Sequence, residues 1–187
     1  PPISSKAART AAGNGFAPTN LAWVVNSPVS FCAKVFRAPA QGHADTPALM
    51  VLAQLLRSNF LHKEIREKGG AYGGGASYDA STATFGFYSY RDPQLAATLD
   101  TFDASLAWAE QAATDQDMRD AAILSVIGAI DRPGSPAGEA VNAFHNRLHG
   151  RGADFLRSLR LSLLAVDTEA LRRAIATHLR PDLGRVA

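Results

Sequence analysis

Residues 61–93, LHKEIREKGGAYGGGASYDASTATFGFYSYRDP, contain the change from helical to strand patterning that decides the fold. A helix should end at Gly69-Gly70, because glycine accepts the left-handed backbone that closes a helix. Two strand-length segments follow, residues 71–78 and 83–90, on either side of a short polar turn. Asp92-Pro93 then starts a further helix, since proline suits a first helical turn. We therefore predict a helix, a β-hairpin and a second helix in succession.

The first strand of this hairpin contains three successive glycines, Gly73, Gly74 and Gly75. Glycine weakens an ordinary strand, so three together suggest that another backbone approaches closely. Side chains alternate between the two faces of a strand. One face would therefore carry Tyr72, Gly74, Ala76 and Tyr78, a shallow trough that is wide enough for an extended peptide. A flexible glycine-rich turn is the alternative, and composition does not decide between the two.

Upstream of residue 61 the pattern predicts a strand region followed by a helix. Residues 1–20 are rich in Pro, Ala, Gly, Asn and Ser and are typical of a linker or leading segment. Residues 21–36 resemble one bulged edge strand or two strands, interrupted by Asn26-Ser27-Pro28. Asp45 or Thr46 can cap the following helix, and Pro47 suits its first position. We also expect Cys32, Trp23 and Trp108 to lie in the core.

Downstream of the hairpin the signal is helical. Caps and apolar stripes predict further helices over residues 115–130, 135–148, 153–164 and 167–179, and residues 184–187 should begin a final strand. Strands that precede a run of helices are typical of an α+β fold. We therefore predict a single α+β domain over residues 21–187, in which helices pack on one face of a mainly antiparallel sheet.

Composition excludes several classes of protein. A chain of 187 residues that is 47% hydrophobic is long and apolar enough to form a core, and it is not a disordered or collagen-like chain. Lys and Arg total 19 against 17 for Asp and Glu, without the clustered positive charge that a nucleic-acid binder needs. No apolar run reaches the length of a membrane span, so we expect neither a nucleic-acid nor a membrane partner.

Four segments point to a known family. These segments resemble the C-terminal half of pitrilysin/insulinase-type zinc peptidases, in the presequence-protease branch. They are FLHKEIREKGGAYGGGASYD, FGFYSYRDP, IDRPGSPAGEA and FLRSLR. The likeness extends over about residues 21–183. It implies the α+β domain that these pitrilysin-type, LuxS-like metallopeptidases repeat four times, of which this chain would be the last repeat.

The resemblance also implies roles for individual residues. In this family an arginine and a tyrosine of the C-terminal half hold the substrate backbone near the scissile bond, and Arg66 and Tyr72 match them. Gly73, Gly74, Gly75 and Tyr78 would contribute to substrate binding. The alternative is a surface ion pair of Arg66 with Glu64 or Glu67, together with a packed Tyr72.

The family's zinc motif, His-x-x-Glu-His, does not occur in this sequence. His145 and His149 are one helical turn apart, but Asn146 stands where a base would be needed in a His-Glu-x-x-His arrangement. The resemblance therefore implies that this chain has no metal ligands and that zinc is bound by an N-terminal half, which would be its partner. The chain alone would be inactive, and short unstructured peptides would be the substrates.

A second reading is a non-catalytic homologue that binds peptides or acts as a scaffold subunit, and a third is a ligand-binding module built on the glycine-rich hairpin. The missing initiator Met suggests a fragment or a processed product. The Ala- and Arg-rich composition favours a bacterial, cytoplasmic source, with a mitochondrial or plastid matrix as the expectation for a eukaryotic one.

Overall fold

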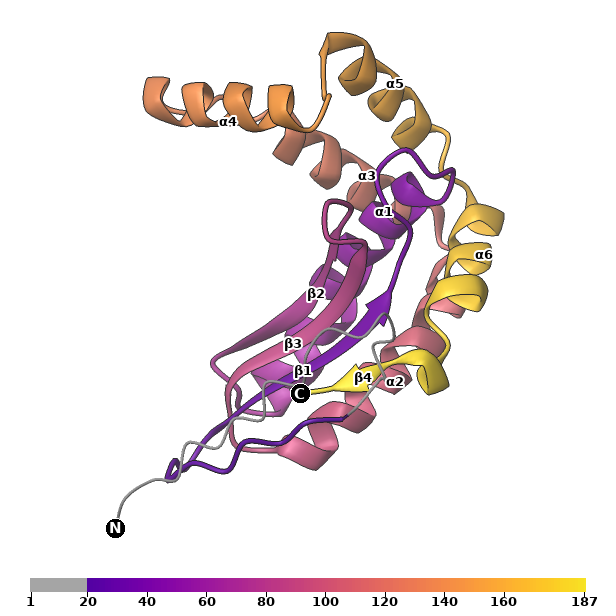
Figure 1. Cartoon of the computed structure of the whole chain (residues 1–187). Helices are drawn as coiled ribbons and strands as arrows, with labels where there is room; N and C mark the ends of the chain where they lie inside the picture. Colours follow the sequence, from indigo (N-terminus) through magenta and orange to yellow (C-terminus); the bar gives the residue numbers. More distant parts are fainter. Residues whose placement is uncertain (1–19) are drawn as a thin grey trace, which may run out of the picture.

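A computed structural model describes residues 20–187, which form a four-stranded antiparallel sheet with helices on one side (Figure 1). The strand order is β2-β3-β1-β4, so β2 and β4 are the edges. The strands are β1 Ser30–Arg37, β2 Gly73–Asp79, β3 Thr84–Asp92 and β4 Arg185–Val186. The predicted hairpin, final strand and antiparallel sheet are confirmed, whereas the leading segment falls almost entirely outside the described residues.

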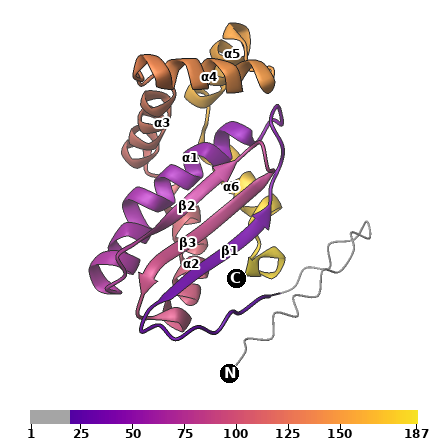
Figure 2. The same ribbon diagram turned by 60° about the vertical axis from the view of Figure 1, so that its left-hand side comes forward.

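The helices follow the predicted order. The first helix, α1 Thr46–Leu56, continues without a break into a π-helical segment, η1 Arg57–Lys68. The others are α2 Leu95–Ala112, α3 Gln116–Ile130, α4 Pro136–Leu148, α5 Ala153–Leu164 and α6 Thr168–His178, with a short 3₁₀ turn η2 Pro181–Leu183. Figure 2 shows α1 and α2 behind the sheet and the opposite face of the sheet turned outward. The predicted one-sided packing is therefore confirmed.

Strand alternation places the core on the helix-covered face. Phe85, Phe87 and Ser89 of β3 are buried, and they pair with Phe36, Lys34 and Cys32 of β1. The aromatic rings contact one another: Phe87 lies 5.4 Å from Phe102 of α2 and 6.0 Å from Phe36, between ring centroids. Cys32 is buried in this layer, as predicted.

The strand predicted for residues 21–36 is only half right, because β1 begins at Ser30. Residues 20–29 run along the molecule without strand structure, and the side chains of Trp23 and Val24 are 78% and 98% exposed. Pro28 has no N–H that could donate a hydrogen bond to a neighbouring strand. The Ser27 hydroxyl donates a local hydrogen bond to the Val29 carbonyl. The prediction that Trp23 lies in the core is therefore wrong, whereas Trp108 packs partly buried against Phe60.

Helices α4 and α5 project beyond the sheet as an arm (Figure 1). Ser135 caps α4 by accepting a hydrogen bond from the Gly138 N–H, as its sequence predicts. No residue of α4 is buried within the described part of the chain. None of the helices in residues 20–187 combines the length and the apolar character needed to cross a membrane.

Candidate functional site

Arg66 lies in the last turn of η1, at a helix end that depends on two glycines. The Gly69 N–H donates to the Glu64 carbonyl at 2.9 Å, and the Gly70 N–H donates to the Arg66 carbonyl at 3.2 Å. A Cβ on Gly69 would lie 2.6 Å from the Ile65 carbonyl oxygen, and Gly70 has φ +80°. Both conditions exclude ordinary side chains. The predicted helix end is therefore confirmed, and it fixes where the chain turns from Arg66 towards Tyr72.

The Arg66 side chain is exposed and is not engaged by a carboxylate. Its Nη1 lies 3.3 Å from Nε2 of His62. The two neighbouring acids have other partners: Glu64 binds Lys68 at 2.7 Å, and Glu67 lies 3.4 Å from His62. The Arg–Glu surface pair considered from the sequence is therefore not formed among residues 20–187. Because a guanidinium offers several N–H donors in a fixed fork, most of them stay available for another acceptor.

Tyr72 lies on the surface, just before β2. Its side chain is 66% exposed, while its backbone N–H donates to the Tyr90 carbonyl at 3.1 Å. The Tyr72 and Tyr90 rings meet edge to face with centroids 5.5 Å apart, and the Arg91 guanidinium lies 6.0 Å from each centroid. Tyr72 is therefore packed on one side, against Tyr90 and Arg91, while most of the residue stays exposed.

Part of the outward face of the sheet is aromatic and apolar. We call this surface the open face, and it consists of Phe31, Val35, Tyr88 and Tyr90, bordered by Tyr72. Phe31 is 60% exposed, and its ring lies 5.3 Å from that of Tyr90. Gly73 pairs with Tyr90 across the ladder, and a Cβ there would meet nothing within 4 Å. Backbone can therefore be approached from solvent at Gly73.

The predicted trough lies on the wrong face. Gly74, Ala76 and Tyr78 point towards the helices, where a Cβ on Gly74 would lie 2.9 Å from Cγ2 of Ile65. The Tyr78 hydroxyl donates to the Pro39 carbonyl at 2.6 Å, and burial raises the pKa of that hydroxyl. The predicted alternation of Gly74, Ala76 and Tyr78 is confirmed, but alternation alone does not tell which of the two faces the helices cover. Tyr72 precedes β2 and does not share this face.

Gly75 lies on the outward side but is covered. A Cβ there would lie 3.1 Å from Cγ of Arg57 and 3.2 Å from the Tyr88 hydroxyl. Of the glycines and tyrosine expected to bind substrate, Gly73 is therefore the one with open space in front of it. Gly74 and Tyr78 contribute to packing against the helices and the loop before α1. Gly75 leaves room for the side chains of Arg57 and Tyr88.

The different surroundings of the glycines give a matched test of stability. Gly74→Ala should destabilise the chain by about 1–3 kcal/mol, because the new methyl group overpacks against Ile65 and the Tyr88 carbonyl. Gly73→Ala should leave stability unchanged or raise it slightly, since its Cβ enters open space. Urea unfolding of both variants measures the difference. Equal free energies of unfolding for the two variants would show that β2 does not pack against Ile65 at Gly74.

One cluster of polar side chains was not found from the sequence. Asp45 occupies the N-cap position of α1, as predicted, but its side chain makes no capping hydrogen bond. It binds His178 and Arg173 of α6, and His43 lies beside it. Burial raises the pKa of Asp45, but hydrogen bonds from His178 and Arg173 outweigh burial and leave that pKa below its ordinary value. Because His178 is 133 residues away from Asp45, no spacing rule could have joined them.

The other histidine pair does not fit the family's zinc motif. The His145 and His149 rings are stacked with centroids 6.4 Å apart on the exposed helix α4. Leu148 stands where His-x-x-Glu-His needs its glutamate. Within residues 20–187, one group of three potential metal ligands lies close together, and it consists of His43, Asp45 and His178. Neither histidine group among residues 20–187 therefore has the spacing of the His-x-x-Glu-His motif.

The fold places the chain in a known structural class. A Helicobacter pylori protease superposes with a TM-score of 0.72 at 17% identity, covering 87% of this chain and 41% of that one. Pitrilysin superposes with a TM-score of 0.66 at 18% identity, covering 86% of this chain and 18% of pitrilysin. The inactive peptidase domain of a putative zinc protease from Bordetella parapertussis gives 0.65 at 17% identity, with 84% and 90% covered. The fold is that of a pitrilysin-type peptidase domain, as the sequence resemblance implied.

Sequence comparison is more specific than fold. The family model described as the PreP C-terminal domain matches residues 20–176, so the chain belongs to the family of presequence-protease C-terminal domains. The mitochondrial presequence protease of Xenopus tropicalis is 38% identical over 95% of this chain, and that of Saccharomyces cerevisiae is 42% identical over 73%. The chain spans only 17% and 14% of the length of these two relatives.

Proposed function

We propose that this chain is the substrate-binding, C-terminal domain of a zinc-dependent metalloendopeptidase that degrades short unstructured peptides. The observation that carries this proposal is the pairing of two exposed donors, Arg66 and Tyr72, with an exposed aromatic face. Family membership supports the class of enzyme, and the surface chemistry supports the part that this domain plays in it.

The two exposed donors and the open face together suit an extended peptide. The Arg66 guanidinium, in the last turn of η1, can bind a carbonyl oxygen through its fork of N–H groups. The Tyr72 hydroxyl is a second donor. Such donors stabilise the negative charge that develops on a carbonyl oxygen during attack. The aromatic rings of the open face would contact substrate side chains of many kinds, which fits a protease that accepts varied peptides.

Zinc and the general base would come from an N-terminal half of the same enzyme, so this chain alone should not cleave peptides. The length of the relatives supports such a partner, because most of each relative lies outside the matched region. The residues of this chain would bind and orient the peptide and stabilise the charge that develops on its carbonyl oxygen.

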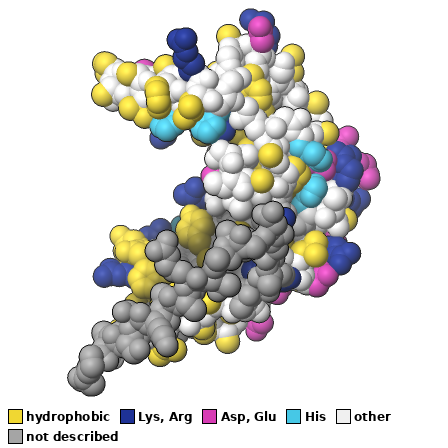
Figure 3. All heavy atoms as spheres, viewed as in Figure 1, with side chains coloured by type: hydrophobic (Ala, Val, Ile, Leu, Met, Phe, Trp, Pro, Cys, Tyr) yellow, Lys and Arg dark blue, Asp and Glu magenta, His cyan; other side chains and the backbone are white. Residues whose placement is uncertain are grey.

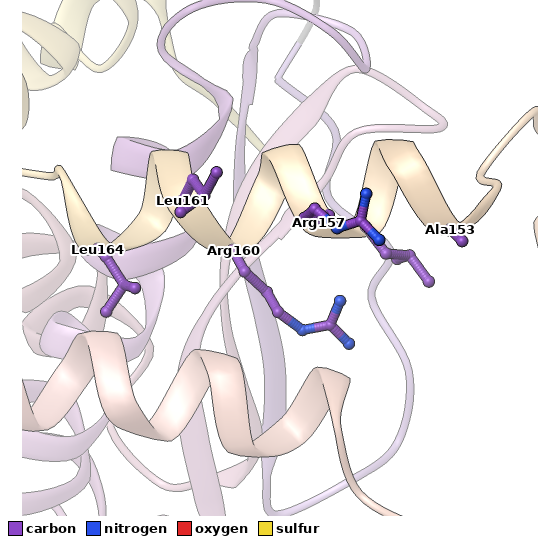
Figure 4. A pocket seen from close by; sticks show the side chains of 6 residues that line it. Ala153, Arg157, Arg160, Leu161 and Leu164 are labelled. Atoms are coloured by element: carbon purple, nitrogen blue, oxygen red, sulfur yellow. The ribbon is translucent and has the colours of Figure 1, made fainter.

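The projecting arm, α4 and α5, has an exposed apolar surface that the N-terminal half would contact. Val141, Phe144 and Leu148 form one stripe along α4 and are 55%, 64% and 65% exposed. Figure 3 shows hydrophobic side chains gathered along the arm. Leu161 and Leu164 of α5 are also exposed, and together with Arg157 and Arg160 they line a shallow hollow along this helix (Figure 4). This hollow contains none of the residues expected to bind substrate, so we assign the arm to contact with the rest of the polypeptide.

Blocking the space in front of Gly73 tests the proposed binding surface. In the full-length protein, Gly73→Val should raise the KM for a short peptide about tenfold, a loss of about 1.4 kcal/mol in binding. Valine suits a strand, so folding should be unaffected. Ser77→Val, further along the exposed side of β2, is the matched control and should leave KM unchanged. An unchanged KM in Gly73→Val would place the peptide elsewhere.

A second function is a non-catalytic homologue that binds or scaffolds peptides. The observation that favours this second function is the fold similarity to the inactive peptidase domain from Bordetella parapertussis, which superposes over 84% of this chain. The two readings differ in the zinc content of the full-length protein. One zinc ion per polypeptide together with an upstream His-x-x-Glu-His supports the peptidase, and their absence supports the scaffold.

The compartment follows from the source of the gene. The relatives named above are mitochondrial by name, which favours a matrix for a eukaryotic source. For a bacterial source, which the Ala- and Arg-rich composition favours, we propose the cytoplasm. Cell fractionation with an antibody against this domain distinguishes these locations.

A further inference from the structure

The cluster around Asp45 brings together three different elements of the fold. His43 belongs to the loop between β1 and α1, Asp45 begins α1, and His178 is the last residue of α6. The Asp45 and His178 side chains are only 8% and 15% exposed, while that of His43 is 49% exposed. One nitrogen from each imidazole and one carboxylate oxygen lie within 4.8 Å of one another. The proposed peptide-binding surface uses none of these three residues.

The two oxygens of the Asp45 carboxylate have separate partners. Arg173 donates to Oδ1 from Nε at 3.1 Å, and its Nη2 lies 3.0 Å from the same oxygen. Oδ2 faces the imidazoles, with His178 Nε2 at 2.9 Å and His43 Nδ1 at 3.9 Å. Arg173 therefore orients the carboxylate from one side and leaves the other oxygen directed at two nitrogens. Outer hydrogen bonds of this kind commonly orient the ligands of protein-bound metals.

We propose that His43, Asp45 and His178 form a binding site for a divalent transition-metal ion of the zinc type. Two imidazole nitrogens and one carboxylate oxygen form a typical ligand set for such ions. Bonds of about 2.0–2.2 Å in a tetrahedral arrangement separate ligand atoms by about 3.3–3.5 Å. The separations of 2.9 and 3.9 Å from Oδ2 lie on either side of this value. The separation between Asp45 and His178 therefore needs only a small shift, whereas His43 needs to reorient.

Binding would replace interactions that the cluster makes without an ion. A proton bridges His178 Nε2 and Asp45 Oδ2, and the ion would take its place, as metal binding usually releases protons from its ligands. His43 Nδ1 accepts the Asp45 N–H at 3.1 Å, so the exposed His43 ring would have to turn to offer a free nitrogen. The exposure of His43 also gives the ion a path from solvent and leaves its remaining coordination position to water.

This site would be structural. An ion held here would tie the β1–α1 loop to the end of α6, which leads through η2 to β4 and thus to the sheet. It would therefore stabilise the folded chain by a free energy that rises with the logarithm of the ion concentration above Kd.

The experiment titrates the EDTA-treated chain with Zn²⁺ by calorimetry and records its melting temperature, with Mg²⁺ as a hard-cation control. All proteins carry His145→Ala and His149→Ala, which removes the second histidine pair. We expect one Zn²⁺ per chain, a higher melting temperature with Zn²⁺ and no effect of Mg²⁺. His43→Ala should weaken Zn²⁺ binding at least about tenfold, and because His43 is half exposed this variant should fold.

The alternative is that the cluster only forms ion pairs and hydrogen bonds. Zn²⁺ binding that is absent, or that is equally strong in His43→Ala and His178→Gln, overturns the proposal. A melting temperature that Zn²⁺ leaves unchanged does so as well. These measurements do not depend on peptide cleavage, so their outcome is independent of the proposed peptidase function.

Discussion

Replacing Arg66 with alanine in the full-length protein should lower kcat/KM for a short peptide by about 10²–10³-fold, the loss typical of one oxyanion donor. Tyr72→Phe, which removes only a hydroxyl, should lower kcat/KM in the same direction. Both side chains are exposed, and neither is buried in the core of residues 20–187. Their loss should therefore leave the melting temperature and the zinc content unchanged.

Two matched variants separate this role from general effects. Arg172→Ala removes an exposed arginine on α6 that lies near Glu169, and it should cleave peptides normally. Tyr78→Phe removes the hydroxyl that donates to the Pro39 carbonyl, so it should cost about 0.5–1.5 kcal/mol of stability but little activity. Wild-type turnover in both Arg66→Ala and Tyr72→Phe would show that neither side chain has the proposed role in peptide cleavage.

Phe87→Ala should be the most damaging single change to the fold. Phe87 is 1% exposed, and its ring lies between those of Phe36, Phe85 and Phe102 at centroid distances of 5.4–6.0 Å. Loss of a buried phenylalanine side chain costs about 3–5 kcal/mol, because the cavity closes only partly. For a chain of this size the melting temperature should fall by about 10 °C.

Phe31→Ala provides the matched control for this core. Phe31 lies on β1 with 60% of its side chain exposed, so its truncation should cost far less than that of Phe87. Urea unfolding of the two variants gives the comparison. A Phe31→Ala variant as unstable as Phe87→Ala would mean that the open face is covered within this chain, which contradicts its proposed role as a binding surface.

Much of the fold could be predicted because its local signals agree with its packing. Gly69-Gly70 ends a helix, Ser135-Pro136 starts one, and alternation in β3 separates the buried Phe85 and Phe87 from the exposed Tyr88. These signals involve neighbours in sequence. The extent of β1 could not be predicted, because residues 21–25 are apolar yet remain exposed, and nothing local distinguishes them from a buried strand.

The candidate site could be predicted only in part, for the same physical reason. The resemblance singles out Arg66 and Tyr72, and the structure places both on the surface. The sequence places Gly74, Ala76 and Tyr78 on one face correctly, but which face the helices cover depends on how β2 pairs with β3, a long-range property. The cluster of His43, Asp45 and His178 depends entirely on tertiary packing of α1 against α6.

The claim that the open face binds the peptide is tested most directly by photocross-linking in the full-length protein. A photoreactive residue in place of Tyr72 or Phe31 should attach to a labelled peptide substrate. The same residue in place of Glu169, which is 80% exposed on α6, should not attach. Labelling at positions 72 and 31, and its suppression by excess unlabelled peptide, is the predicted result. Equal labelling at position 169, or none at position 72, would contradict the account.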